Sequence, residues 1–188
     1  PDKEYSVPLP NINEPNLVKA IKQIHDSFTI KRDRINSYSD NEVLVSAYAY
    51  FYLTTNFPKL KFILNQLPEK VLDDLQKTNF IDVGIGPGTY LLAWLDFFKL
   101  NERQSYIGVD KSEKMLSQAK MILDEFFPSN NIEYQLSSGP INLELTNKST
   151  LFFGHGLNEM GADLLKNWIS LVSPAFVFVV GTGTHDVF

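Results

Sequence analysis

The chain has 188 residues, 44% of them hydrophobic and 21% charged, which is the composition of a folded globular domain with room for a substantial core. Its formal net charge of −5 gives no general attraction for nucleic acids, so DNA is not expected as a partner, but it is compatible with a local basic surface that contacts RNA. The absence of cysteine excludes disulfides, thiolate metal sites and covalent cysteine catalysis within these residues.

Targeting and membrane signals are not found in the sequence. No apolar run reaches the roughly 18 residues of a membrane-spanning helix, so no membrane association is expected. The chain begins at Pro1 without a signal-peptide pattern, which predicts a fragment or processed form of an intracellular protein. We expect a cytoplasmic location, or the mitochondrial matrix if the protein belongs to a eukaryotic organelle.

The N-terminal region begins with a predicted helix. Apolar side chains recur at three- and four-residue spacing from Pro15 to about Arg34, which is typical of an amphipathic helix. Lys31, Arg32 and Arg34 near its end have two interpretations: an RNA-contacting patch, or a solvated helix end whose positive charge suits the helix dipole. The second is the more common meaning of such a short charge run.

A second helix is predicted after Ser39 or Asp40, either of which can cap its first turn. Residues 43–53 are apolar or aromatic on nearly all sides, so other parts of the chain must cover this helix. Tyr48 and Tyr52 lie one turn apart on one face. They either pack in the core, as aromatic stripes usually do, or line a substrate pocket as part of a lid.

Two prolines divide the rest of this region. Pro58 is expected to start another short helix, which Pro68 ends. An amphipathic turn over 71–75 then leads into the first strand. We therefore expect an N-terminal helical segment or lid over residues 1–75 and a second unit over residues 76–188.

Beyond this segment, apolar runs of strand length alternate with helical patterns. The predicted strands are one that begins at Phe80 and those over 106–109, 132–136, 149–153 and 175–180, and the predicted helices cover 90–100, 112–126 and 163–172. This alternation predicts an α/β fold with a doubly wound, mainly parallel sheet and right-handed crossovers.

The stretch that follows the first strand predicts a ligand site. Asp82 lies near the strand end, and Gly84, Gly86 and Gly88 follow at alternate positions before an apolar helix. Glycine lets the chain turn with positive φ and lets a ligand approach the backbone, while free amides at a helix start favour a polar or anionic group. The alternative is that Asp82 is an ordinary strand-end carboxylate that caps a turn.

Asp110 provides a second anchor for a ligand. It ends the second strand, at the position where a carboxylate accepts hydrogen bonds from both hydroxyls of a ribose. A dinucleotide fingerprint has two residues between its second and third glycines, whereas only Pro87 separates Gly86 from Gly88. The sequence thus predicts a nucleoside ligand held by a turn of a different type.

The run Asp-x-Gly-x-Gly-x-Gly, followed by Asp110 and Lys-Ser-x-x-Met-Leu, closely resembles the nucleoside-binding motifs of class I S-adenosylmethionine-dependent methyltransferases. This resemblance implies a Rossmann-like methyltransferase sheet with S-adenosylmethionine as cofactor. By it, Asp82 faces the amino-acid end of the cofactor, Asp110 holds the ribose, and Lys111 and Met115 flank the adenine. The residues that would wrap the cofactor are Gly84, Gly86, Pro87, Gly88 and Thr89.

Three further segments narrow the resemblance. Residues 38–67 contain Tyr-x-Asp…Ala-Tyr-x-x-Phe-Tyr-Leu-x-x-Asn-x-x-Lys-Leu, residues 154–160 read Gly-His-Gly-Leu-Asn-Glu-Met, and residues 179–188 read Val-Val-Gly-Thr-Gly-Thr-His-Asp-Val-Phe. Together they resemble the methyltransferase-like family of small-ribosomal-subunit assembly proteins of mitochondria and bacteria, in which Glu and Pro stand in place of Gly181 and Gly183. The resemblance implies small-subunit rRNA or ribosomal proteins as partners.

The resemblance also implies features that these residues do not contain. Class I methyltransferases add two strands after the fifth, and this family carries a four-cysteine iron–sulfur motif further downstream. The sequence ends at Phe188, right after the fifth predicted strand, and has no cysteine. Strands six and seven are therefore expected to be missing from this chain, and no cluster is predicted in it.

The segment after the fourth strand holds the candidate catalytic residues. Methyl transfer from a sulfonium is an in-line displacement in which alignment of the reactants supplies much of the rate. The cysteine route to pyrimidine C5 is excluded, and Gly154 to Glu159 replaces the Asn/Asp-Pro-Pro-aromatic segment of exocyclic-amine methyltransferases. His155 is the candidate general base, with Glu159 nearby. Alternatively, His155 packs on the cofactor and Glu159 starts the next helix. No metal site is predicted.

Three functions are compatible with these features. The first is a cofactor-binding methyltransferase domain that acts on, or assists assembly of, the small ribosomal subunit. The second is a non-catalytic assembly factor that keeps the methyltransferase fold. The third is a methyltransferase for oxygen or nitrogen atoms of a small-molecule acceptor, with the Tyr48 and Tyr52 helix as lid and His155 as base.

Overall fold

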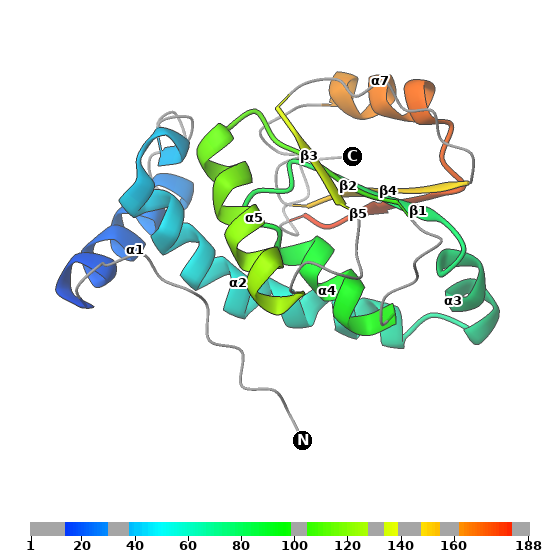
Figure 1. Ribbon diagram of the computed structural model, residues 1–188, viewed down its shortest axis with the longest axis horizontal. Coiled ribbons are helices and arrows are strands. Elements are labelled where there is room, and N and C mark those ends of the chain that lie inside the picture. Colours follow the sequence, from blue (N-terminus) through cyan, green and yellow to red (C-terminus); the bar gives the residue numbers. More distant parts are fainter. Residues whose placement is uncertain are drawn as a thin grey trace.

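The computed structural model describes residues 14–29, 38–98, 105–127, 134–138, 148–154 and 162–181, and its centre is a parallel sheet. The sheet has five strands in the order β3-β2-β1-β4-β5, and all four neighbouring pairs are parallel (Figure 1). The strands are β1 Asn79–Val83, β2 Tyr106–Val109, β3 Tyr134–Ser137, β4 Ser149–Phe153 and β5 Phe176–Val179. This arrangement confirms the predicted doubly wound α/β fold.

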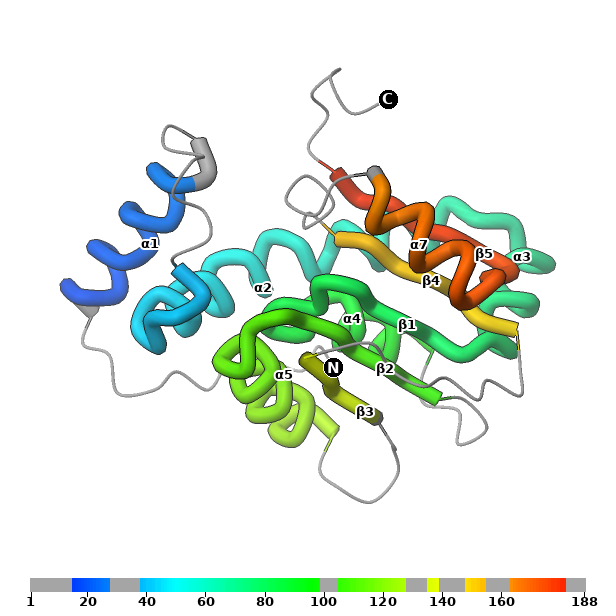
Figure 2. The backbone as a smooth tube through the Cα atoms, turned by 90° about the horizontal axis from the view of Figure 1, so that it is seen from above, coloured from blue at the N-terminus to red at the C-terminus, as the bar shows by residue number. Residues whose placement is uncertain are grey.

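Helices cover both faces of the sheet. They are α1 Glu14–Thr29, α2 Glu42–Asn65, α3 Glu69–Leu75, α4 Thr89–Phe98, α5 Glu113–Phe126 and α7 Ala162–Val172. One face packs against α2, α4 and α5, and the other packs against α7 (Figures 1 and 2). Helix α1 packs on the start of α2, away from the sheet. The N-terminal helical segment is therefore present as predicted, with α1 and the start of α2 at the carboxyl end of the strands.

The alternation of side chains between the two faces of the sheet positions Asp82 in strand β1. Phe80 belongs to the core under α4, whereas Ile81 and Val83 belong to the core under α7. Because successive side chains of a strand point to opposite faces, Asp82 shares the α4 face with Phe80. All five side chains of β1 are buried, so Asp82 lies in the interior, next to the start of α4.

Helix α2 differs from the prediction in two ways. It runs without interruption from Glu42 to Asn65 with Pro58 inside it, so the expected separate helix starting at Pro58 is wrong. Proline removes one intrahelical hydrogen bond, but Leu53 and Leu60 on either side of it are buried against the core, and this packing holds the helix together. The N-cap is Asn41, which accepts from two amides of the first turn, and not Ser39 or Asp40.

Other boundaries agree closely with the sequence. The predicted helix 15–34 is observed as α1 up to Thr29, and Lys31, Arg32 and Arg34 lie outside the described residues. Strand β4 has its predicted bounds, and Ser112 caps α5 through the amide of Met115. Within the described part of the chain, no helix has both the length and the apolar character needed to cross a bilayer.

Candidate functional site

The site is built around the turn that joins β1 to α4. Gly84, Gly86 and Gly88 have φ values of 74°, 53° and 83°, a region that side chains strongly disfavour. The amides of Gly84 and Ile85 both donate to the carbonyl of Val109, at 2.7 and 3.0 Å, which fixes the turn to the end of β2. Glycine is thus required here by backbone conformation, as the sequence spacing predicted.

Asp110 closes the other side of this turn. Its Oδ2 accepts from the amide of Gly86 at 2.9 Å, and its Oδ1 accepts from the amide of Ser112 at 2.9 Å. A carboxylate has about four acceptor positions, so about two remain for a ligand. Burial raises the pKa of Asp110, while both amide hydrogen bonds and the charge of Lys111 lower it. The result is an oriented carboxylate fixed beside the glycine turn.

Asp82 is the most unusual side chain of the site. It is fully buried, and neither carboxyl oxygen has a hydrogen-bond partner among the residues that the structure describes. Burial, and secondarily the negative charge of Asp110, raise the pKa of Asp82 to about 8. The amide of Leu91 lowers this pKa in part, although it does not reach standard hydrogen-bond geometry. A buried carboxyl that has no partner among the described residues, next to a turn whose Gly84 and Gly86 are partly exposed, points to a polar or cationic ligand group.

Tyr90 connects the turn with the end of β4. A Cβ atom placed on Gly154 would lie 2.8 Å from Cε2 of Tyr90, so this ring occupies the space that a side chain at position 154 would need. Burial and the nearby charge of Asp82 raise the pKa of the Tyr90 hydroxyl. The first turn of α4 therefore contacts the strand end from which the segment with His155 continues.

Helix α2 reaches the same turn from outside the sheet. A Cβ atom placed on Gly86 would lie 3.8 Å from Cε1 of Tyr48, which is ordinary contact distance. The Tyr48 ring stacks on Tyr38, with ring centroids 5.2 Å apart, and lies 4.4 Å from the ring of Tyr52. Of the two tyrosines that the sequence assigned either to core or to a lid, Tyr48 thus lies beside the glycine turn, and both pack against the core of α1 and α2.

The structure brings most of the candidate residues together. Pro87, Gly88 and Thr89 are buried at the start of α4. Met115 is buried in α5, whereas Lys111 is exposed. His155 and Glu159, the candidate catalytic residues, lie outside the described residues. The described ranges contain no cluster of three metal-ligating side chains.

Residues 42–188 match the family described as mitochondrial small ribosomal subunit Rsm22. The chain belongs to the Rsm22 family. The match begins at Glu42, the first residue of α2, so the family unit includes the helix that carries Tyr48. A search of the curated proteins found no match.

A solved methyltransferase structure shares the fold of this Rsm22 family member, and further solved structures are similar to it. The magnesium protoporphyrin IX methyltransferase of Synechocystis PCC 6803, solved with bound SAH, is 18% identical, with a TM-score of 0.50 over 78% of this chain and 68% of that chain. A putative S-adenosyl-L-methionine-dependent methyltransferase from Methanococcus maripaludis is 15% identical, with a TM-score of 0.48 over 92% and 66%. PKMT2 from Rickettsia typhi, solved with AdoHcy, is 18% identical, with a TM-score of 0.42 over 56% and 21%. The chain thus spans only about a fifth of the Rickettsia protein and about two thirds of the other two.

Sequence reasoning missed two contributors to the site. Tyr90 was assigned only to an apolar helix, although its place directly after the glycine turn is a signal that it faces the strand ends. The turn at 38–40 was considered for capping alone, whereas the carbonyl of Ser39 accepts a hydrogen bond from Ser112, two residues after Asp110. Nothing in the local pattern predicts that contact, because it joins elements that are far apart in the sequence.

Proposed function

We propose that this domain binds S-adenosylmethionine and acts on, or assists assembly of, the small ribosomal subunit. The observation that supports it best is the pairing of the glycine turn with Asp110. The amide of Gly86 fixes one oxygen of that carboxylate, and free acceptor positions remain beside bare backbone. This is the arrangement that a ribose with two neighbouring hydroxyls needs.

The residues present fit this cofactor. Asp110 would accept from the ribose, and Gly84 and Gly86 would lie against the cofactor because neither has a side chain in the way. Asp82, which is buried and has no hydrogen-bond partner among the described residues, would face the cationic amino-acid end. Lys111 and Met115 would flank the adenine. When bound, S-adenosylmethionine supplies an electrophilic methyl group on a sulfonium.

The chain's own contribution to methyl transfer is chiefly alignment. An in-line displacement gains about 7–11 kcal/mol from correct orientation of the two reactants. A turn fixed to β2 by two amide hydrogen bonds and to Asp110 by a third is rigid enough to orient a ligand. His155 and Glu159, which follow β4, are proposed as the groups beside the acceptor, with His155 as the base when the acceptor must lose a proton.

The ribosomal part of the proposal is supported by the family name alone, since the Rsm22 family is described as mitochondrial small ribosomal subunit. Small-subunit rRNA or ribosomal proteins are accordingly the proposed partners, and the mitochondrial matrix is the proposed location. A non-catalytic assembly factor with the same fold is distinguished by turnover. Methyl incorporation from labelled S-adenosylmethionine into purified small subunits, lost in His155→Ala, supports the enzyme, and cofactor binding without incorporation supports the assembly factor.

Cofactor binding itself is tested by calorimetry. We expect S-adenosylmethionine to bind the wild type with a Kd in the micromolar range, corresponding to about 8 kcal/mol. Asp110→Asn should weaken binding by about 10- to 100-fold, because hydrogen bonds to a charged group are lost. Asp73→Asn, on the exposed surface of α3, is the matched control and should bind as the wild type does. No binding heat with wild type, or equal Kd values for the two variants, contradicts the proposal.

A further inference from the structure

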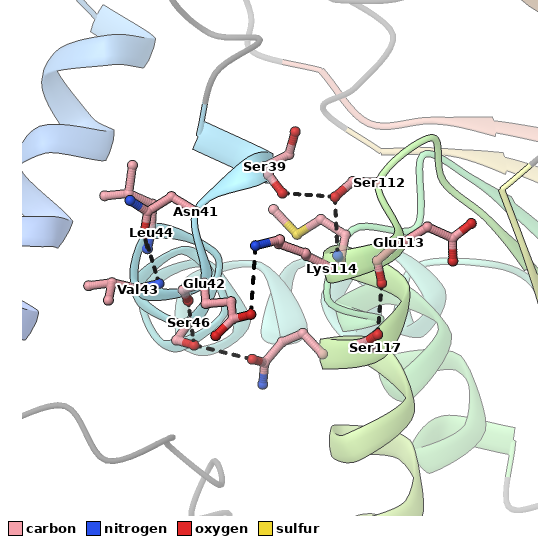
Figure 3. Close-up of polar contacts among 12 residues, drawn as sticks. Ser39, Asn41, Glu42, Val43, Leu44, Ser46, Ser112, Glu113, Lys114 and Ser117 are labelled. Atoms are coloured by element: carbon pink, nitrogen blue, oxygen red, sulfur yellow. Dashed lines mark hydrogen bonds and ion pairs between the residues drawn. The ribbon is translucent and has the colours of Figure 1, made fainter.

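The helical segment is attached to the residues that follow Asp110. Three polar contacts join the region of residues 39–46 to the first turns of α5 (Figure 3). They are the hydrogen bond from Ser112 Oγ to the carbonyl of Ser39 at 3.0 Å, the ion pair of Lys114 with Glu42 at 3.6 Å, and the contact of Ser46 Oγ with Gln118 Oε1 at 3.3 Å. The ion pair is solvent-exposed and contributes little, so the two buried contacts are the important ones.

Ser112 links this attachment directly to the ligand site. Its amide donates to Oδ1 of Asp110, and its hydroxyl donates to the carbonyl of Ser39. One residue therefore connects the carboxylate proposed to hold the ribose with the turn that precedes α2. A displacement of α2 would disturb Ser112, and a ligand that fixes Asp110 would also hold Ser112 in place.

Tyr48 makes the second connection, at Gly86. The amide of Gly86 is directed to Asp110, while a Cβ atom placed on Gly86 would lie 3.8 Å from Cε1 of the Tyr48 ring. The Tyr48 ring packs on the rings of Tyr38 and Tyr52, with centroids 5.2 and 4.4 Å away. A group that approaches Gly86 from this side would therefore lie next to the Tyr48 ring.

We propose that Tyr48 is a ligand-contacting residue of the site, which packs against the nucleoside bound at Gly86, so that the bound nucleoside and the docked α2 stabilise each other. The inference rests on the proposed function, because it takes S-adenosylmethionine as the ligand. Thermodynamic linkage makes the effect reciprocal: whatever the docked helix adds to ligand affinity, the ligand adds to docking of the helix.

The test compares two tyrosines of the same helix. Tyr48→Ala removes the ring at Gly86, and Tyr50→Ala removes a ring that is 39% exposed. Calorimetry should show S-adenosylmethionine binding weakened about tenfold in Tyr48→Ala, the loss expected for one aromatic contact with a nucleoside, and unchanged in Tyr50→Ala. Tyr48→Phe should bind as the wild type, because the ring contact and not the hydroxyl is proposed to act.

Hydrogen exchange distinguishes a ligand contact of Tyr48 from a purely structural role of this residue. Adding S-adenosylmethionine to wild type and to Tyr50→Ala should slow exchange of the amides of residues 43–52, and this protection should be absent in Tyr48→Ala at saturating ligand. If circular dichroism shows that Tyr48→Ala has lost helix, the test uses Tyr48→Leu, which keeps an apolar side chain in the α1–α2 core. The same loss of affinity and of protection is expected for Tyr48→Leu.

The outcomes separate this inference from the proposed function. If the wild type binds S-adenosylmethionine, and Tyr48→Ala and Tyr50→Ala bind it with equal affinity and show equal protection, the role of Tyr48 is overturned. The proposed function then stays intact. Wild type that does not bind S-adenosylmethionine overturns both. Weaker binding together with lost protection in Tyr48→Ala or Tyr48→Leu, but not in Tyr48→Phe or Tyr50→Ala, supports the inference.

Discussion

Asp82 is the residue of the candidate site whose surroundings least favour an ionised carboxyl. Its carboxyl is buried without a hydrogen-bond partner among the described residues, and its pKa is raised to about 8. Carboxyls in such surroundings are kept at functional sites because a ligand compensates for them. The folded protein alone therefore holds a proton at Asp82 that the unfolded chain, with a carboxyl pKa near 3.9, would release above pH 4.

The pH dependence of stability follows from this difference. Between about pH 4 and pH 8 the native state binds more protons than the unfolded state, so the free energy of unfolding falls as pH rises. The slope from Asp82 is at most about 1.4 kcal/mol per pH unit, and the raised pKa of Asp110 acts in the same direction. Asp82→Asn should flatten this slope in urea unfolding measured from pH 5 to pH 8.

The control for this prediction is Asp73→Asn, which changes an exposed carboxyl of α3 and should keep the wild-type slope. A variant Asp82→Asn whose unfolding free energy depends on pH as steeply as that of the wild type would show that the buried carboxyl is not the group that titrates.

At this scale, some site residues could be predicted from sequence and others could not. Asp82, the alternate glycines and Asp110 were predictable because turn conformation and strand ends are local features of the chain. The placement of Tyr48 against Gly86 depends on how α2 packs on distant elements, so the sequence left it open between core and lid. The roles of His155 and Glu159 stay predictions.

Helix α2 is the element for which local rules gave the wrong answer. Pro58 usually begins or breaks a helix, and the sequence was interpreted in that way. The helix continues through it because Leu53, Leu60 and Leu64 form one buried stripe against the core shared with α4, while Pro58 itself is exposed. Tertiary packing thus outweighed the local cost of a proline inside a helix. The hydrophobic pattern along the chain does not show such packing.

Replacing this proline should therefore stabilise the protein. Pro58→Ala restores a backbone donor inside an exposed helical turn, and we expect the free energy of unfolding to rise by about 1–3 kcal/mol. Pro68→Ala is the matched control, because Pro68 occupies the N-cap position of α3, where no intrahelical hydrogen bond is lost. If guanidinium unfolding gives Pro58→Ala no greater increase in the free energy of unfolding than Pro68→Ala, the packing explanation is contradicted.

The strands and remaining helices were largely predictable. Alternation of apolar runs with one-face helices identified β4 with its observed bounds and α5 with its cap, because in this fold periodicity and burial agree. The proposed division after residue 75 stays a prediction, although side chains of α2 and of the sheet share one core.

At the scale of the whole molecule, topology explains where the site lies. The chain forms β1 in the middle of the sheet, continues outward through β2 and β3, and then returns to the other side of β1 with β4. The carboxyl ends of β1, β2 and β4 therefore meet at the point where the order reverses, which is where ligands bind in open α/β sheets. The glycine turn, Asp110 and Gly154 lie at those three ends.

The most direct test of the account is a crystal structure of this chain with S-adenosylhomocysteine. We predict that both ribose hydroxyls lie within about 2.6–3.2 Å of the Asp110 carboxylate, with the ligand against Gly84 and Gly86. A ligand bound elsewhere, or a ribose directed away from Asp110 with the glycine turn uncovered, would contradict the central claim that this turn and this carboxylate form the cofactor site.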